Sequence, residues 1–203
     1  MTAAVFWDRI APRYATRPVP DADAYAATLE RTRSYLSPTD TVLEVGCGTG
    51  TTALLLAPSV RHITATDYAA GMIDIAQRKH AEQGPANVTF RQAGLSETDS
   101  ERYDAILAFN LLHLVTDVPG AVRILADRLK SGGHFISKTA CLGDGAWPLR
   151  LVIPAMRAIG KAPYVSFLRR TELDAMVEAA GLRIVETGGY PAARNHFIVA
   201  RKP

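Results

Sequence analysis

The chain of 203 residues has 48% hydrophobic and 21% charged residues, a composition typical of a globular domain and not of a disordered or membrane protein. Its formal net charge of +3 comes from interspersed acidic and basic residues, so the charge gives no indication of a nucleic-acid partner. Two cysteines, no apolar run near the roughly 20 residues of a membrane span and no signal-peptide core lead us to expect a cytoplasmic protein.

The N-terminal segment, residues 1–36, is predicted to form two helices. Pro18 and Pro20 interrupt the helical pattern, because proline removes a backbone donor and clashes with the preceding turn. The turn cluster at residues 37–40 then ends the second helix before the first strand.

Residues 37–140 alternate between strands and helices. Strands are predicted at residues 41–45, 63–66, 88–90, 105–109 and 134–137. The helical stripe before the fifth strand runs through Leu129, and we expect the glycines of residues 130–133 to end that helix. This alternation predicts an α/β fold with a Rossmann-like, doubly wound sheet and right-handed crossovers.

Residues 141–170 do not fit the alternation and are predicted to be an insertion over the carboxyl edge of the sheet, with a helix at 148–159. Thr171 and Asp174 have the spacing of a capping box that would open a last helix, which Gly181 closes. Two antiparallel strands are expected to follow, at 182–186 and 196–200. We interpret the whole chain as one domain with four segments, which are residues 1–36, 37–140, 141–170 and 171–203.

A glycine-rich loop follows the first strand. Gly46, Gly48 and Gly50 alternate with other residues, whereas a dinucleotide fingerprint would place its third glycine at Thr51. The lysine of a phosphate loop is also absent. Asp67 ends the second strand, where a carboxylate can accept hydrogen bonds from a ribose diol. The pattern therefore predicts an adenosine ligand that has no pyrophosphate at the loop.

Five motifs in this order resemble those of the class I S-adenosylmethionine-dependent methyltransferases. They are VLEVGCGTG at 42–50, TDY at 66–68 followed by Met72, YDAI at 103–106, NLLHL at 110–114 and LKSGG at 129–133. The most similar groups are the type 11 and ubiquinone-biosynthesis methyltransferases, which act on small molecules. The resemblance implies a seven-stranded sheet whose last strand is antiparallel, with S-adenosylmethionine as the cofactor.

The resemblance also implies a cofactor site. Glu44 would organise the methionine end of the cofactor, Asp67 would bind its ribose, and a tyrosine near the N-terminus would close over its carboxylate. One departure concerns adenine, because Gly94 stands where the family usually has an aspartate, so that neighbouring backbone, Gln92 or Ser96 would have to substitute. The implied cofactor-binding residues are Tyr14, Glu44, Gly46, Cys47, Gly48, Gly50, Asp67, Tyr68, Met72, Ala93, Gly94, Leu95, Asn110 and Leu111.

The methyl acceptor is expected to lie beyond the fourth and fifth strands. His113 is a candidate general base there, although a histidine at the start of a helix more often packs locally or faces solvent. Lys138 follows on the fifth strand and could bind an acidic acceptor or reach solvent. Trp147, Tyr164 and Arg169 of the insertion are candidate acceptor contacts. The histidines lack ligand spacing, so no metal site is predicted.

Three functions remain open at this point. The first is methyl transfer by in-line displacement to an oxygen, nitrogen or carbon atom of a small molecule. The second is a module that binds the cofactor without turnover. The third is a nicotinamide-dependent oxidoreductase, which the glycine spacing disfavours. The sequence identifies neither the acceptor nor the oligomeric state.

Overall fold

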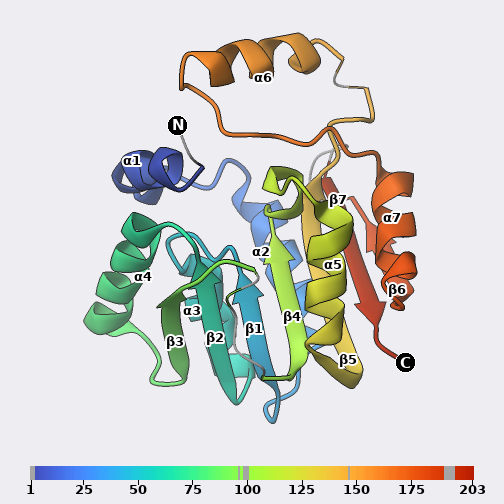
Figure 1. The fold of residues 1–203 in the computed structure, drawn as a ribbon. Coiled ribbons are helices and arrows are strands. Elements are labelled where there is room, and N and C mark those ends of the chain that lie inside the picture. Colours follow the sequence, from blue (N-terminus) through green and yellow to red (C-terminus); the bar gives the residue numbers. More distant parts are fainter. Residues whose placement is uncertain (1–2, 96, 98–100, 146, 190–194) are drawn as a thin grey trace.

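A computed structural model of the chain describes residues 3–95, 97, 101–145, 147–189 and 195–203. Its centre is a seven-stranded sheet in the order β3-β2-β1-β4-β5-β7-β6 (Figure 1). β7 is antiparallel to both β5 and β6, and the other pairs are parallel. The predicted fold class is therefore confirmed. The strands are β1 (Thr41–Val45), β2 (His62–Asp67), β3 (Val88–Gln92), β4 (Tyr103–Phe109), β5 (Leu129–Ala140), β6 (Arg183–Gly188) and β7 (Asn195–Arg201).

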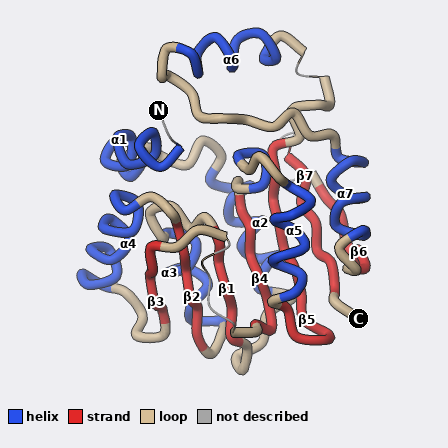
Figure 2. Tube along the Cα trace, in the orientation of Figure 1, coloured by secondary structure: helices blue, strands red, loops and turns tan. Residues whose placement is uncertain are grey.

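Helices cover both faces of this sheet, as Figure 2 shows. On one face Leu43 and Ile106 pack in a core cluster with Leu173 of α7, while on the other their neighbours Val42 and Leu107 belong to a second core cluster. Consecutive strand residues thus point to opposite buried faces, which explains the nearly continuous apolar runs in these strands. The helices are α1 (Ala3–Ala15), α2 (Ala22–Arg33), α3 (Thr51–Leu56), α4 (Ala70–Gln83), α5 (Val118–Asp127), α6 (Leu149–Ala158) and α7 (Arg170–Ala179), with 3-10 turns η1 (Ala57–Ser59) and η2 (Leu112–Leu114).

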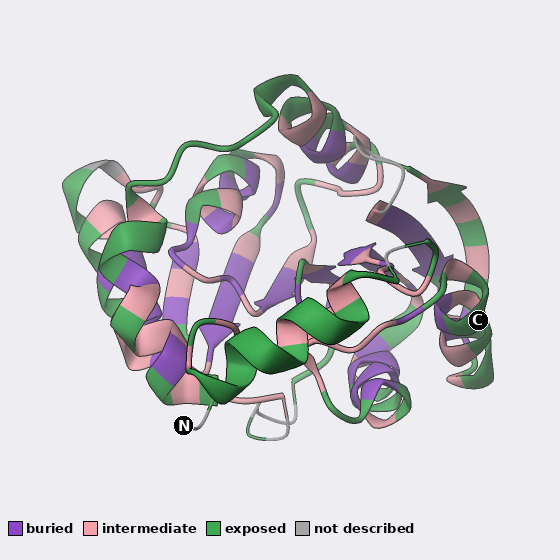
Figure 3. Cartoon of the chain, turned by 90° about the horizontal axis from the view of Figure 1, so that it is seen from above, coloured by how far each residue is buried: buried purple, intermediate pink, exposed green. Residues whose placement is uncertain are grey.

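Two segments lie over the carboxyl ends of the parallel strands. Helix α1 packs on α4, where the carboxylate of Asp8 accepts the backbone N–H of Gly71 at 2.8 Å and Ala11 is buried. The insertion places α6 above this edge of the sheet, and none of the residues of α6 is buried (Figure 3). The N-terminal helix is therefore attached closely to the sheet layer, while α6 stands off from it.

Two predicted boundaries are wrong. Helix α5 ends at Asp127, and residues 130–133 belong to β5, which begins at Leu129. The backbone of Gly132 donates to the carbonyl of Lys202 and that of Lys202 donates to Gly133, both at 2.9 Å, so these glycines continue the sheet.

The predicted capping box is also misplaced. Helix α7 begins two residues earlier than Thr171 would allow, because the Glu172 carboxylate accepts the backbone N–H of Arg169 at 2.9 Å. Asp174 lies inside the helix and accepts a hydrogen bond from Nε2 of His196 at 2.7 Å. The true cap thus uses the acidic residue two positions before the one we predicted. Gly181 follows α7 with a φ of +81°, as expected of a glycine that closes a helix.

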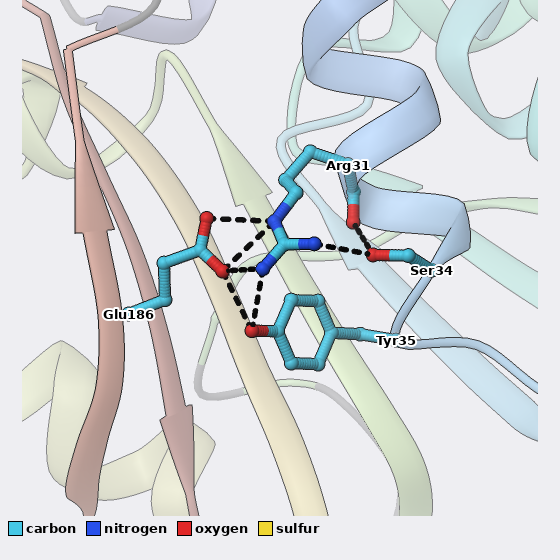
Figure 4. A network of polar contacts seen from close by, with 4 residues as sticks. All are labelled: Arg31, Ser34, Tyr35 and Glu186. Atoms are coloured by element: carbon cyan, nitrogen blue, oxygen red, sulfur yellow. Dashed lines mark hydrogen bonds and ion pairs between the residues drawn. The ribbon is translucent and has the colours of Figure 1, made fainter.

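A polar network ties α2 to the edge strand β6 (Figure 4). Nε of Arg31 donates to both carboxylate oxygens of Glu186, at 2.7 and 2.8 Å, and the Tyr35 hydroxyl donates to Glu186 at 2.6 Å. The hydrogen bond from Arg31 lowers the pKa of Glu186, and the bond to Glu186 raises the pKa of Tyr35. The network fixes the second helix of the N-terminal segment to the sheet.

Replacing Glu186 with glutamine is expected to lower the free energy of unfolding by about 1 kcal/mol at pH 7, because Arg31 loses its charged partner. The effect stays small because the Arg31 side chain is partly exposed, so that solvent screens the ion pair. A carboxylate whose folded pKa is depressed stabilises the fold above its unfolded pKa and loses that contribution as the pH falls through the folded pKa. Urea unfolding should therefore show a difference between the variant and the wild type at pH 7 that shrinks as the pH falls through the depressed pKa of Glu186. A difference that does not change as the pH is lowered would contradict the role of charge.

Candidate functional site

A cavity of about 600 Å³ opens at the carboxyl edge of the sheet. One wall is the connection between α1 and α2, from Tyr14 to Asp21, together with Tyr25 of α2. The other is built from the glycine loop, the first turn of α3 and the ends of β4, β5 and β7. Of the residues predicted to be functional, Tyr14, Cys47, Asn110 and Lys138 line it.

The glycine loop has a backbone that only glycine adopts without strain. Gly46, Gly48 and Gly50 have φ values of +66°, +54° and +77°. A Cβ on Gly46 would lie 2.7 Å from Cδ1 of Leu111, which explains why the loop after β4 can approach so closely. A Cβ on Gly48 would meet only Cε1 of Tyr14, at 4.0 Å, so the backbone of Gly48 is open toward the tyrosine of the N-terminal segment.

Glu44 lies on β1 directly before this loop and is 3% exposed. Its Oε2 is buried and accepts no hydrogen bond from the described residues. Burial, and then the nearby charge of Asp67, raises the pKa of Glu44 to about 8. An orphaned carboxyl oxygen under the loop fits the amino group of a bound amino-acid moiety, since such a group would satisfy it.

Asp67 at the end of β2 is joined to the same loop. Its Oδ2 accepts the backbone N–H of Gly48 and its Oδ1 accepts that of Ala69, both at 2.9 Å. Burial raises the pKa of Asp67 above its usual value. A carboxylate oxygen can accept more than one hydrogen bond, so both oxygens retain capacity for a diol.

The residues predicted around ribose and adenine lie along β2 and the loop after β3. Burial raises the pKa of Tyr68 to about 12, and the backbone of Ala93 donates to the Asp67 carbonyl at 3.0 Å. Met72 is buried in a small cluster with Ala11 of α1, so it supports the N-terminal helix.

The loop predicted to contact adenine is held by its own hydrogen bonds. The backbone N–H of Gly94 donates to the Glu97 carboxylate at 3.0 Å, and the Gln92 side chain donates to the Tyr68 carbonyl at 3.2 Å. Leu95 packs against the core. Ser96 lies outside the described residues.

Asn110 follows β4 in an unusual conformation. Its φ of +53° is uncommon for a residue with a side chain. Its backbone N–H donates to the carbonyl of Lys138 at 2.7 Å, which holds the ends of β4 and β5 together at the cavity. The strained turn therefore brings Asn110, Leu111 and the glycine loop to one place.

His113 lies in η2, outside the set of described residues that line the cavity. Burial lowers its pKa to about 4, and its Nδ1 is buried with no hydrogen-bond partner among the described residues. Its backbone carbonyl accepts the N–H of Ser166 at 2.7 Å, which attaches the insertion to this turn. A histidine with such a low pKa is a weak base at neutral pH.

The three candidate acceptor contacts of the insertion are not brought to the cavity among the residues described. Trp147 is 72% exposed, and Tyr164 stacks with Arg157 beside α6. Arg169 packs at Gly143 and is the N-cap residue directly before α7. All three were predicted from the position of the insertion, and none of them is among the described residues that line the cavity beside the glycine loop. The insertion's own helix α6 lies above the sheet (Figure 1).

The sequence did not single out several polar residues in the cavity wall or, in the case of Lys79, in contact with it. The Tyr25 hydroxyl lies 2.9 Å from Oγ1 of Thr52, and the ammonium of Lys79 donates to Thr49 and Thr51 at 3.0 and 3.1 Å. Thr49 and Thr51 directly flank Gly50 and Thr52 follows them, a position that could have indicated these threonines. Tyr25 and Lys79 come from helices with no motif of their own.

A protein-family model described as a methyltransferase domain matches residues 17–187. The ubiquinone biosynthesis O-methyltransferase of Coxiella burnetii is 30% identical over 169 residues, which cover 79% of this chain and 71% of that protein. The corresponding protein of Serratia proteamaculans is 31% identical over 170 residues, covering 79% and 70%.

Solved structures share the fold at lower identity. The N-methyltransferase NodS from Bradyrhizobium japonicum, in complex with S-adenosylhomocysteine, has a TM-score of 0.73 at 17% identity, with 100% of both chains covered. The [4+2]-cyclase SpnF has a TM-score of 0.80 at 17% identity, covering 100% of this chain and 97% of that one. Since a cyclase shares it, the fold alone does not fix the chemistry.

The matched family decides the class, because its model spans most of the chain. The chain belongs to the methyltransferase-domain family: it is an S-adenosylmethionine-dependent methyltransferase that acts on a small molecule.

Two further findings concern the described residues only. None of their helices has the length and apolar character needed to cross a membrane, and no group of three metal-ligating side chains comes together.

Proposed function

We propose that this enzyme methylates a hydroxyl oxygen of a small acceptor that occupies the cavity beside the glycine loop. The observation that carries the proposal is the cavity itself, which extends from Cys47 and Thr49 of the loop to Asn110 and Lys138. Its volume of about 600 Å³ is in the range of small-molecule sites. The choice of oxygen is supported by the O-methyltransferases among the curated relatives.

The residues proposed to hold the cofactor surround the loop. Glu44 would accept a hydrogen bond from the amino group of the methionine moiety, and Asp67 would accept hydrogen bonds from the ribose hydroxyls. Gly46 and Gly48, which have no side chains, would leave room for the methionine moiety. Bound S-adenosylmethionine supplies a methyl group on a positively charged sulfur. The protein then has to align the acceptor and exclude water, which the α1–α2 connection is placed to do.

Tyr14 is proposed to close over the cofactor. Its ring lies against Gly48 in the cavity wall and stacks edge-on with Trp7 at 6.2 Å. Removing the hydroxyl by Tyr14→Phe is expected to weaken binding of S-adenosylhomocysteine by about 1 kcal/mol, or roughly fivefold, because one hydrogen bond to a charged group is lost.

Isothermal titration calorimetry checks this prediction, with Tyr103→Phe as the matched control. Tyr103 begins β4 at the opposite edge of the sheet, and its hydroxyl donates to Glu101 at 3.1 Å. Equal affinities for the wild type and Tyr14→Phe would exclude the hydroxyl as a ligand of the cofactor.

The burial of His113 favours a packing role over general base catalysis. We therefore expect His113→Gln to retain the shape of the pH–rate profile between about pH 6 and 9, since a group with a pKa of about 4 does not titrate there. Single-turnover rates at several pH values provide the measurement. A rate that becomes first order in hydroxide in the variant alone would restore His113 as the base.

The proposed activity is tested by incubating the enzyme with S-adenosylmethionine and matched aromatic alcohols, amines and thiols. Mass spectrometry should detect methyl ethers from the alcohols. Binding of S-adenosylhomocysteine without any product would favour a binding module, and retention of a nicotinamide dinucleotide instead would favour an oxidoreductase. Products from the amines alone would contradict the choice of oxygen.

A further inference from the structure

A buried lysine lies in the wall of the cavity. Lys138, near the end of β5, is 8% exposed and is flanked in the sheet by Phe109 of β4 and Phe197 of β7. Burying a charged ammonium is costly unless it is paired, and lysine is among the residues least often buried. A buried ammonium in a ligand cavity therefore needs an anion or a set of hydrogen-bond acceptors to offset this cost.

The described residues supply only a weak partner. Nζ of Lys138 donates to Oγ1 of Thr28 on α2 at 3.3 Å. The Thr28 hydroxyl donates its own hydrogen bond to the carbonyl of Ala24, at 2.8 Å, so toward the lysine it acts as an acceptor. The hydrogen bond to Thr28 orients the ammonium of Lys138. The other two of its three N–H groups have no acceptor among the described residues.

The charge of Lys138 is also not balanced by a contact. Within the described part of the chain Lys138 forms no ion pair with a carboxylate, and Asp21, which caps α2, acts on it only through space. Burial lowers the pKa of Lys138, and Asp21 partly opposes this effect. Arg17 and Asp21 both line the opposite wall of the cavity, so these two side chains together add no net negative charge to balance Lys138.

We propose that Lys138 binds an anionic oxygen of the methyl acceptor, so that the acceptor is an acidic small molecule, a carboxylate or an ionised phenol. The inference rests on the proposed function, because it assumes an acceptor in this cavity. An anionic oxygen satisfies the two open N–H groups and neutralises the buried charge in one contact. Thr28 acts as a positioning residue that fixes the direction of the ammonium.

The test uses the enzyme saturated with S-adenosylhomocysteine and two pairs of probes. The carboxylate arm compares 3,4-dihydroxybenzoate with 3,4-dihydroxybenzamide, and the phenolate arm compares 4-nitrocatechol with its dimethyl ether. Ligand-observed NMR titration is expected to show that the anion binds at least about tenfold more tightly than its neutral partner in one arm. Lys138→Met should abolish this preference and Lys138→Arg should retain most of it.

The matched control is Lys130→Met. Lys130 lies on the same strand, is half exposed and pairs with Asp104 at 2.8 Å outside the cavity, so the preference should be that of the wild type. No preference in either arm, or a preference that survives Lys138→Met, overturns the inference. Circular dichroism of both methionine variants is expected to match the wild type.

The affinity for S-adenosylhomocysteine separates this inference from the function on which it rests. Calorimetry should give Lys138→Met the affinity of the wild type within about twofold. A loss of about tenfold or more would assign Lys138 to the carboxylate of the cofactor and overturn the acceptor role. Failure of the wild type itself to bind S-adenosylhomocysteine would instead overturn the proposed function.

Discussion

Replacing Asp67 with alanine is expected to weaken binding of S-adenosylhomocysteine by about 1.5–3 kcal/mol, which is roughly 10- to 150-fold. The loss has two parts. The proposed bonds to the ribose hydroxyls disappear, and the backbone N–H groups of Gly48 and Ala69 lose the carboxylate that holds them at 2.9 Å. Because Gly48 belongs to the loop itself, the variant should also loosen the surface on which the cofactor lies.

Calorimetry on Asp67→Ala, Asp67→Asn and Asp104→Ala distinguishes these parts. Asparagine keeps one acceptor oxygen and is expected to fall between alanine and the wild type. Asp104 is a matched control, since its Oδ2 accepts the backbone N–H of Thr41 at 2.9 Å and the Lys130 ammonium at 2.8 Å, far from the loop along the strands. Asp104→Ala should lower stability and leave the affinity unchanged. Unchanged affinity in Asp67→Ala would remove Asp67 from the cofactor site.

The sheet could be predicted because its strands carry their own pattern. Apolar runs between turn residues fixed the positions of the five parallel strands up to residue 137, and the antiparallel pair at the C-terminus followed from the short connection. The boundary at residues 130–133 could not be predicted. A glycine pair is compatible with a helix end and with a strand, and the backbone bonds to Lys202 that decide between them come from the far end of the chain.

The site was predictable to the extent that its residues follow strands. Glu44, Asp67 and Asn110 occupy strand ends, and parallel strands bring such ends to one edge. The opposite wall of the cavity, residues 15–21, has no motif, because its place depends on how α1 packs on α4. Trp147 and Tyr164 were chosen for their type and position, and sequence cannot give the height at which α6 lies.

The glycines of the loop have separable roles. Gly50 is packed from below, since a Cβ there would lie 2.6 Å from Cε1 of Phe90 and 2.8 Å from Cβ of Ala76. Gly48 lies between two residues that line the cavity, and a Cβ added there would meet only Cε1 of Tyr14, at 4.0 Å. Both have a positive φ, so both lose about 1–2 kcal/mol to backbone strain when replaced by alanine.

Gly50→Ala is therefore expected to lower the free energy of unfolding by about 2–5 kcal/mol, because overpacking adds about 1–3 kcal/mol to the strain. Gly48→Ala should lose only the strain in stability and yet bind S-adenosylhomocysteine more than tenfold more weakly, since the new methyl group projects toward the space assigned to the methionine moiety. Urea unfolding and calorimetry on both variants measure the two quantities. If Gly48→Ala bound the cofactor normally, the methionine moiety would have to lie elsewhere, and the roles assigned to Glu44 and Tyr14 would fall with it.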